Sequence, residues 1–400
     1  MATVFIPIFG QHVSARQSET AKVRKSLHPY CSDDDVKQAV SFLFEYSGSQ
    51  DTYNTYRREL ERLYQWSWLV RNLSVVTITR QDIVDYTLFF KDPPADWFSV
   101  KRTRRFLTVG GELRSNSEWR PFVKTDKLVH QSPASLKSML AVLSTFYEYL
   151  LQESIVQRNP VKLIRKHQLI QKQQETIIHR QLNTTQWVAL LQAVKLKTLE
   201  DDSYERHLFI LSCFFLLGLR ISELASSTMQ SPTMSQFYQD HSRCWWFQTV
   251  GKGNKSREVA VPDDCLTALV RYRRFLGLTD LPMFNDHSPL LPKDRGRGSL
   301  GIRRVRTLVK DAFSAGVDHL NQQGKDRDAL MLKSATAHWL RHTAIAHDVS
   351  QNRPLTDIRD DAGHQSINTT NIYLQSSRKE RYLSAKKKQL KPQQEGDDGW

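Results

Sequence analysis

The sequences GLRISEL at residues 218–224 and AHWLRHT at residues 337–343 decide how this chain of 400 residues is interpreted. An almost fully apolar run, Leu208 to Leu219, leads into the first of them. At about 12 residues it is shorter than the roughly 20 that a membrane span needs, so it predicts a buried helix. Arg220 stands at the end of that run, where a charge is costly unless it is paired or used. Glu223, three residues on, is its candidate partner.

The second stretch carries two histidines and an arginine at helical spacing. His338 and Arg341 are three residues apart, so they would share one face of a helix. His338 and His342 have a spacing that suits zinc, but the chain has no HExxH glutamate and no cysteine cluster there. We therefore expect neither a metal nor another cofactor.

Apolar periodicity indicates helices at both ends of the first half of the chain. It runs from Ser32, continues through an amphipathic stretch from Asp51 to Trp66, and returns from Pro133 to about Glu153. Near the middle of the second half, residues 245–250 and 258–261 are rich in β-branched and aromatic side chains. They flank the turn sequence GKGNK at 251–255, which predicts a β-hairpin.

The expected fold is therefore mainly α with a small β-sheet, in the α+β class. The length suits two or three domains, and residues 166–182 are polar with few apolar anchors, which is typical of a linker. The predicted organisation has five parts: a flexible leader at 1–28, a helical domain at 29–165, the linker at 166–182, a second domain at 183–385, and a basic then acidic tail at 386–400.

The composition favours a polyanionic partner. The net charge is +15, from 57 Lys and Arg against 42 Asp and Glu, and cations near phosphates release condensed counterions. Simple solubility is the competing explanation for a basic chain. Four cysteines without a CxxC pair indicate thiols in a reducing cytosol. Since we also see no signal peptide, we expect a cytoplasmic, nucleoid-associated protein that does not enter a membrane.

Residues 91–132 alternate basic and aromatic side chains without a regular period. They fit either a nucleic-acid-contacting arm or a solvated insertion that is packed by its own aromatic rings. The cations that we expect to contact nucleic acid, here and in the flanking helical and hairpin regions, are Arg57, Arg58, Lys101, Arg102, Arg104, Arg105 and Lys255.

Six residues occur in an order that is informative as a set, although each alone is a weak signal. They are Arg220, Lys252, His338, Arg341, His364 and Tyr373. With GLRISEL and GKGNK, this set resembles the tyrosine recombinases of the phage integrase family. The resemblance is specific over about residues 205–385 and looser over 30–165. The chain departs from the family at Ala362, where leucine is usual, and in two stretches that look like an inserted loop at 225–242 and an expansion at 91–132.

The resemblance implies a reaction and a role for each residue. Tyr373 would attack a DNA phosphate and form a 3′-phosphotyrosyl link, while Arg220 and Arg341 would bind the non-bridging oxygens. The remaining roles would be proton donation by Lys252, proton transfer or phosphate binding by His338, phosphate binding by His364, and support of Arg220 by Glu223.

The same resemblance implies partners. The helical domain, as a core DNA-binding domain, and the catalytic domain would clamp double-stranded DNA, as a homotetramer on paired sites with accessory DNA-bending proteins. We expect the integrase or resolvase of a mobile element. Two alternatives are a type IB topoisomerase and a DNA-binding regulator that kept the fold and lost activity. Lys386, Lys387 and Lys388 fit either a segment that docks on a neighbouring protomer or a tail that is solvated or touches DNA.

Overall fold

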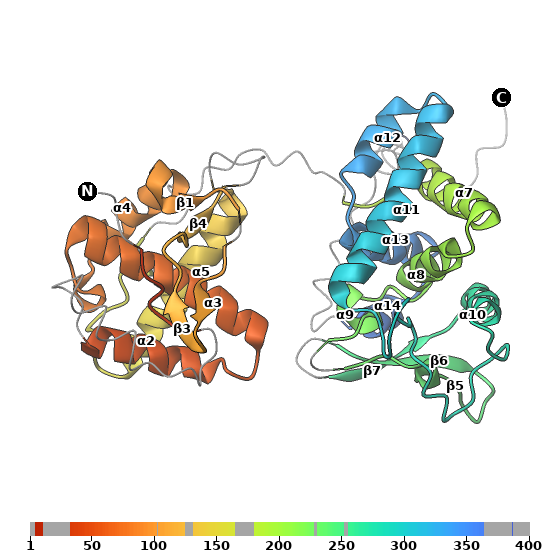
Figure 1. Ribbon diagram of the computed structural model, residues 1–400, viewed down its shortest axis with the longest axis horizontal. Helices are drawn as coiled ribbons and strands as arrows, with labels where there is room; N and C mark the ends of the chain where they lie inside the picture. Colours follow the sequence, from red (N-terminus) through yellow and green to blue (C-terminus); the bar gives the residue numbers. More distant parts are fainter. Residues whose placement is uncertain are drawn as a thin grey trace, which may run out of the picture. The chain divides into compact units, whose positions relative to one another are not determined.

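The computed structural model describes residues 5–10, 33–101, 103–124, 131–164, 180–227, 230–251, 255–363 and 386 (Figure 1). The chain divides into two compact units, residues 1–176 and 177–400, and each unit has a hydrophobic core of its own. Most of the predicted linker lies outside the described residues. Within the described ranges, no helix has the length and apolar character required to cross a membrane.

The first unit is built on four helices: α2 (Asp33–Glu45), α3 (Gln50–Trp66), α4 (Arg80–Lys91) and α5 (Pro133–Gln152). Of these, α2, α3 and α5 follow the predicted periodicity. The short turns η1 (Ser67–Arg71) and η2 (Val75–Thr77) connect α3 to α4. A capping box starts α4, because the side chains of Thr79 and Asp82 bond each other's backbone N–H groups. Ser132 caps α5, whose first residue is a proline.

Between α4 and α5, where the sequence fits either a nucleic-acid-contacting arm or an insertion packed by its aromatic rings, the chain forms small strands. After the 3-10 turn η3 (Ala95–Trp97), the strands are β1 (Phe98–Ser99), β2 (Phe106–Val109), β3 (Glu112–Ser115) and β4 (Phe122–Val123). β1 pairs with β4 in parallel, and β2 and β3 form a hairpin whose turn, Gly110 and Gly111, has positive φ. Trp97, Trp119 and Phe122 are buried, so these rings pack the unit's core.

The N-terminal residues 5–10 are not part of a loose leader, contrary to the prediction from the sequence. Phe5, Ile8 and Phe9 are at most 2% exposed and belong to the core of the first unit. The backbone N–H of Ile8 donates to Glu61 Oε1 at 2.5 Å. We call residues 5–10 the N-terminal anchor.

The second unit packs its helices around the predicted apolar one. Its described elements are α7 (Thr184–Glu200), α8 (Tyr204–Leu216), α9 (Ile221–Leu224), η4 (Met234–Gln236), β5 (Phe237–Gln239), β6 (Trp245–Val250), β7 (Ser256–Ala260), α10 (Asp263–Phe275), α11 (Ile302–Gln322), α12 (Asp326–Lys333), α13 (Ala337–Ser350) and α14 (Leu355–Ala362). α8 packs against α7, α10, α11 and α13 (Figure 1).

A three-stranded antiparallel sheet, in the order β5-β6-β7, lies beside these helices (Figure 1). The predicted hairpin is β6 and β7, with Phe247 opposite Val259, and Gly251 N–H donates to the carbonyl of Lys255 at 2.8 Å. The segment 225–242 is not simply an inserted loop, because it contains η4 and β5 and supplies the third strand. β7 also packs against α14.

Candidate active site

Arg220 and Glu223 are joined at the start of α9. The carboxylate of Glu223 is fully buried, accepts from the Arg220 backbone N–H at 2.6 Å, and lies 3.0 Å from Arg220 Nη1. The Arg220 side chain is 29% exposed, so part of its guanidinium group still faces solvent. This is the pair that the sequence predicted.

Arg341 reaches the same region from α13. Its Nη1 donates to the carbonyl of Gly218, and its Nη2 donates to the carbonyl of Ala362 at 2.5 Å. Arg220 Nη2 donates to the next carbonyl, that of Gly363, at 3.0 Å. Two guanidinium groups that are far apart in the sequence therefore meet at consecutive carbonyls at the end of α14.

Gly363 ends α14 in the left-handed conformation, with φ +61°. A Cβ atom there would lie 2.9 Å from both Cδ and Nη1 of Arg257, so the position needs glycine for its dihedral angles and for its space. This turn brings the chain, one residue before His364, to the two arginines.

Arg257, on β7, is a member of this cluster that the sequence did not indicate. Its Nη1 and Nη2 both bond the carboxylate of Glu223, the latter at 2.9 Å, and its Nε donates to the carbonyl of Asp361 at 3.0 Å. A Cβ atom at Gly251, where the hairpin turn begins, would lie within 3.6 Å of all three charged side chains. An arginine in a strand is usually taken as solvent-facing, and only its contacts reveal otherwise.

His338 lies on an exposed position of α13, one turn before Arg341. Desolvation lowers the pKa of His338, and the positive charges of Arg341, Arg180 and Arg220 lower it further. The rings of His338 and His342 lie edge to face, 4.3 Å apart. Across the described part of the chain, no three His, Cys, Asp or Glu side chains gather as metal ligands would.

The other residues predicted for the active site and for DNA contact fall into two groups, those outside the described residues and those that are exposed. Lys252, His364, Tyr373 and Arg102 lie outside the described residues. The four exposed cations are Arg58, Lys101, Arg104 and Lys255.

Two of the arginines predicted to contact DNA bond groups within the first unit. Arg105 pairs with Glu61, and both Arg57 and Arg105 donate to the carbonyl of Gly10, at 3.2 and 3.3 Å. Desolvation and the neighbouring Arg105 charge lower the pKa of Arg57 to about 10. These two arginines hold the N-terminal anchor, which is a structural role.

A cluster of exposed cations near α9 was missed from the sequence. We call it the basic surface, and it consists of Lys293, Arg295, Arg297, Arg303, Arg304, Arg306 and Lys310. It spans the loop before α11 and the first turns of that helix. This loop is bonded to the segment that follows α9, because Ser226 N–H donates to the carbonyl of Leu300 at 2.8 Å. The density of Arg and Lys over residues 293–310 was the available signal.

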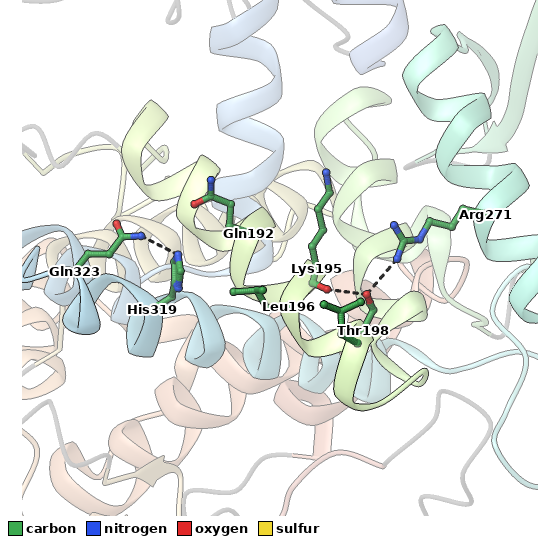
Figure 2. Close-up of a pocket in the computed structure, with 8 residues that line it drawn as sticks. Gln192, Lys195, Leu196, Thr198, Arg271, His319 and Gln323 are labelled. Carbon is green, nitrogen blue, oxygen red and sulfur yellow. Dashed lines mark hydrogen bonds between the residues drawn. The ribbon is translucent and has the colours of Figure 1, made fainter.

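A surface depression of about 570 Å³ lies elsewhere on this unit, among α7, α10 and α11 (Figure 2). Its polar side chains bond one another, because Gln323 Nε2 lies 2.8 Å from His319 Nε2 and Arg271 Nη2 donates to Thr198 Oγ1 at 3.1 Å. None of the residues that line it belongs to the arginine cluster, so we assign it no role in the chemistry.

Comparisons with known proteins agree with this arrangement. Residues 180–380 match the model of the phage integrase family. The tyrosine recombinase XerC of Thermodesulfovibrio yellowstonii is 26% identical over 259 residues, which cover 64% of this chain and 75% of the relative.

Solved structures show the same fold. XerH site-specific recombinase bound to a palindromic difH substrate has a TM-score of 0.54 at 16% identity, covering 95% of this chain and 91% of XerH. The Tn1549 transposon integrase in complex with circular intermediate DNA has a TM-score of 0.53 at 14% identity, covering 87% of this chain and 98% of that one. The chain therefore belongs to the phage integrase family of tyrosine recombinases, enzymes that cleave and rejoin DNA.

Proposed function

We propose that Arg220, His338 and Arg341, together with Lys252, His364 and Tyr373, form the active site of this site-specific recombinase. The observation that carries the proposal is the meeting of the Arg220 and Arg341 guanidinium groups at the carbonyls of residues 362 and 363. Guanidinium groups match phosphate geometry and keep their charge at every physiological pH. A guanidinium has five N–H donors, so one side chain can hold a carbonyl and a phosphate oxygen together.

The chemistry then runs as a transfer of one phosphate ester to another. The phenol oxygen of Tyr373 forms a bond to phosphorus, the bond from phosphorus to the 5′-oxygen breaks, and that oxygen takes a proton from Lys252. The phenol proton passes to His338, whose lowered pKa keeps it neutral and able to accept it near pH 7. Rejoining reverses these steps, and the covalent link preserves the bond energy so that no ATP is needed.

Charge stabilisation supplies the largest share of the rate. The transition state gains negative charge on the non-bridging oxygens, and preorganised donors at such a position are worth roughly 3–4 kcal/mol each. Arg220 is the more accessible of the two arginines, because it is half-buried whereas Arg341 is buried. We therefore assign Arg220 the closer contact with the phosphate and Arg341 a second one beneath it.

The partner is duplex DNA, held mainly through its phosphates. The net charge of +15 and the basic surface beside α9 support this, because phosphate contacts position a protein on DNA. We further propose a homotetramer on paired sites, aided by accessory DNA-bending proteins, which acts in the cytoplasm for a mobile element. The likeness to the Tn1549 transposon integrase supports the last point.

A suicide duplex tests the site directly. A nick near the scissile phosphate lets the short 5′-hydroxyl strand diffuse away, so the wild-type chain should accumulate as a covalent protein–DNA adduct. Tyr373→Phe lacks the attacking oxygen and should form no adduct while binding the duplex normally. Equal adduct from both proteins would refute the assignment of Tyr373. Exchange of strands between two duplexes, rather than relaxation of one, would then separate a recombinase from a type IB topoisomerase.

A further inference from the structure

Arg257 forms more contacts with the proposed site than its place in a strand would suggest. It bonds both carboxylate oxygens of Glu223 and the carbonyl of Asp361, and it packs against Gly363. It therefore joins three elements, β7, α9 and the end of α14. Its side chain is only 11% exposed, less than half the exposure of Arg220.

We propose that Arg257 is a positioning residue for cleavage, which orients Glu223 and, through it, the guanidinium group of Arg220. The proposal rests on the function assigned above. It adds a residue that acts through Glu223 rather than through the DNA, since the Arg257 side chain is 11% exposed and its guanidinium group bonds the Glu223 carboxylate and the Asp361 carbonyl.

The carboxylate geometry is the first support. Glu223 accepts from Arg220 with both oxygens, one from the backbone N–H and one from Nη1, while Arg257 contacts the same two oxygens. The fork of Arg257 therefore sets the plane of the carboxylate. Without it, Glu223 could rotate and carry Nη1 of Arg220 away from its present position.

The backbone at the end of α14 is the second support. Arg257 Nε bonds the carbonyl of Asp361, and Arg220 Nη2 bonds the carbonyl of Gly363 two residues later. Arg257 thus fixes the turn that supplies the other anchor of Arg220. The bonds of the Arg220 guanidinium to Glu223 and to Gly363 therefore depend on partners that Arg257 itself contacts.

Charge is the third support. Arg257 and Arg220 share the carboxylate of Glu223, so these three side chains carry a net charge of +1, to which the neighbouring guanidinium group of Arg341 adds. A phosphodiester that becomes doubly negative in its transition state suits such an excess. If Glu223 paired with Arg220 alone, the pair would be neutral. Because Arg257 shares the carboxylate, the positive charge of Arg220 is only partly neutralised and can still attract a phosphate.

Single-turnover cleavage of two suicide duplexes tests the proposal in the full chain. One duplex has a phosphodiester at the scissile position, and the other has a methylphosphonate, which lacks one charged oxygen and depends less on arginine. Arg257→Gln should slow diester cleavage about 10- to 100-fold, as removal of a supporting partner typically does. It should slow methylphosphonate cleavage less than about threefold, because the contact that it disturbs is the one to the missing oxygen.

Two further variants keep the result interpretable. Arg257→Lys retains the charge but not the fork, so its diester rate should lie between those of the wild type and Arg257→Gln. Arg273→Gln is the matched control, because Arg273 also pairs with a carboxylate, Asp286 at 2.7 Å, and with a carbonyl, Thr279 at 2.6 Å. Its loss, if any, should be equal on the two duplexes.

The outcomes distinguish failure of the positioning role of Arg257 from failure of the proposed DNA-cleavage function. A diester-selective loss in Arg257→Gln supports the positioning role, whereas equal losses on both duplexes, or no loss, would overturn it. Absence of any adduct from the wild-type chain on either duplex would instead defeat the proposed function. Thermal unfolding of each variant establishes that the protein compared is folded.

Discussion

Replacement of Glu223 with glutamine is the sharpest test of the charged cluster. Glu223→Gln keeps the shape of the side chain but removes the charge that two guanidinium groups share. Because Glu223 is fully buried and its partners are 29% and 11% exposed, solvent screens the interaction little. Breaking a buried pair by removing one charge costs about 3–5 kcal/mol. An amide also places its NH₂ against one guanidinium, so we expect the upper half of that range.

Urea denaturation of the full chain measures this loss. With a slope of roughly 2 kcal/mol per M, the midpoint of the second unit should fall by about 2–2.5 M, while the first unit is unaffected. Glu205→Gln is the control, because Glu205 pairs with an Arg271 side chain that is 45% exposed, and such pairs contribute about 1 kcal/mol or less. A Glu223→Gln midpoint within error of the Glu205→Gln midpoint would refute the reasoning.

Because the pKa of His338 is lowered, the cleavage rate should fall only when the pH drops below about 6.5. His338→Gln should remove this fall in rate at low pH. A fall centred above about pH 6.5 in the wild-type chain would contradict the assignment. The same shift makes folding less favourable as the pH drops below about 6.5, since the unfolded chain takes up the proton first. Phe5→Ala should cost the first unit about 3–5 kcal/mol in urea denaturation, and an unchanged midpoint would show that the N-terminal anchor is dispensable. Replacing Arg303, Arg304 and Arg306 with glutamine should flatten the plot of log affinity against log salt by up to about 0.9 per lost phosphate contact. An unaltered slope would remove the basic surface from the DNA interface.

Helices with a long apolar period were predictable from the sequence. α3, α5, α8 and α13 lie where periodicity or motif placed them, because helical spacing is a local signal. The pairing of Arg220 with Glu223 was predictable for the same reason, since the two lie one turn apart.

Features that depend on distant partners were not predictable. β5 has only three residues and exists because it pairs with β6, so 225–242 resembled a loop. The N-terminal anchor is too short to show a period, and its burial depends on a core assembled from later helices. Arg257 could not be assigned without knowing that α9 and the end of α14 meet at its strand. The roles of Lys252, His364 and Tyr373 stay predictions, as they lie outside the described residues.

The possession of two separate cores has an evolutionary consequence. The family match at residues 180–380 falls within the second unit, which also contains the charged cluster of Arg220, Glu223, Arg257 and Arg341. The first unit can acquire appendages such as the β2–β3 hairpin without disturbing that chemistry, since its side chains pack in another interior. We expect sequence changes in the interior of the first unit to leave the packing around the arginine cluster unchanged, because the two interiors share no side chains.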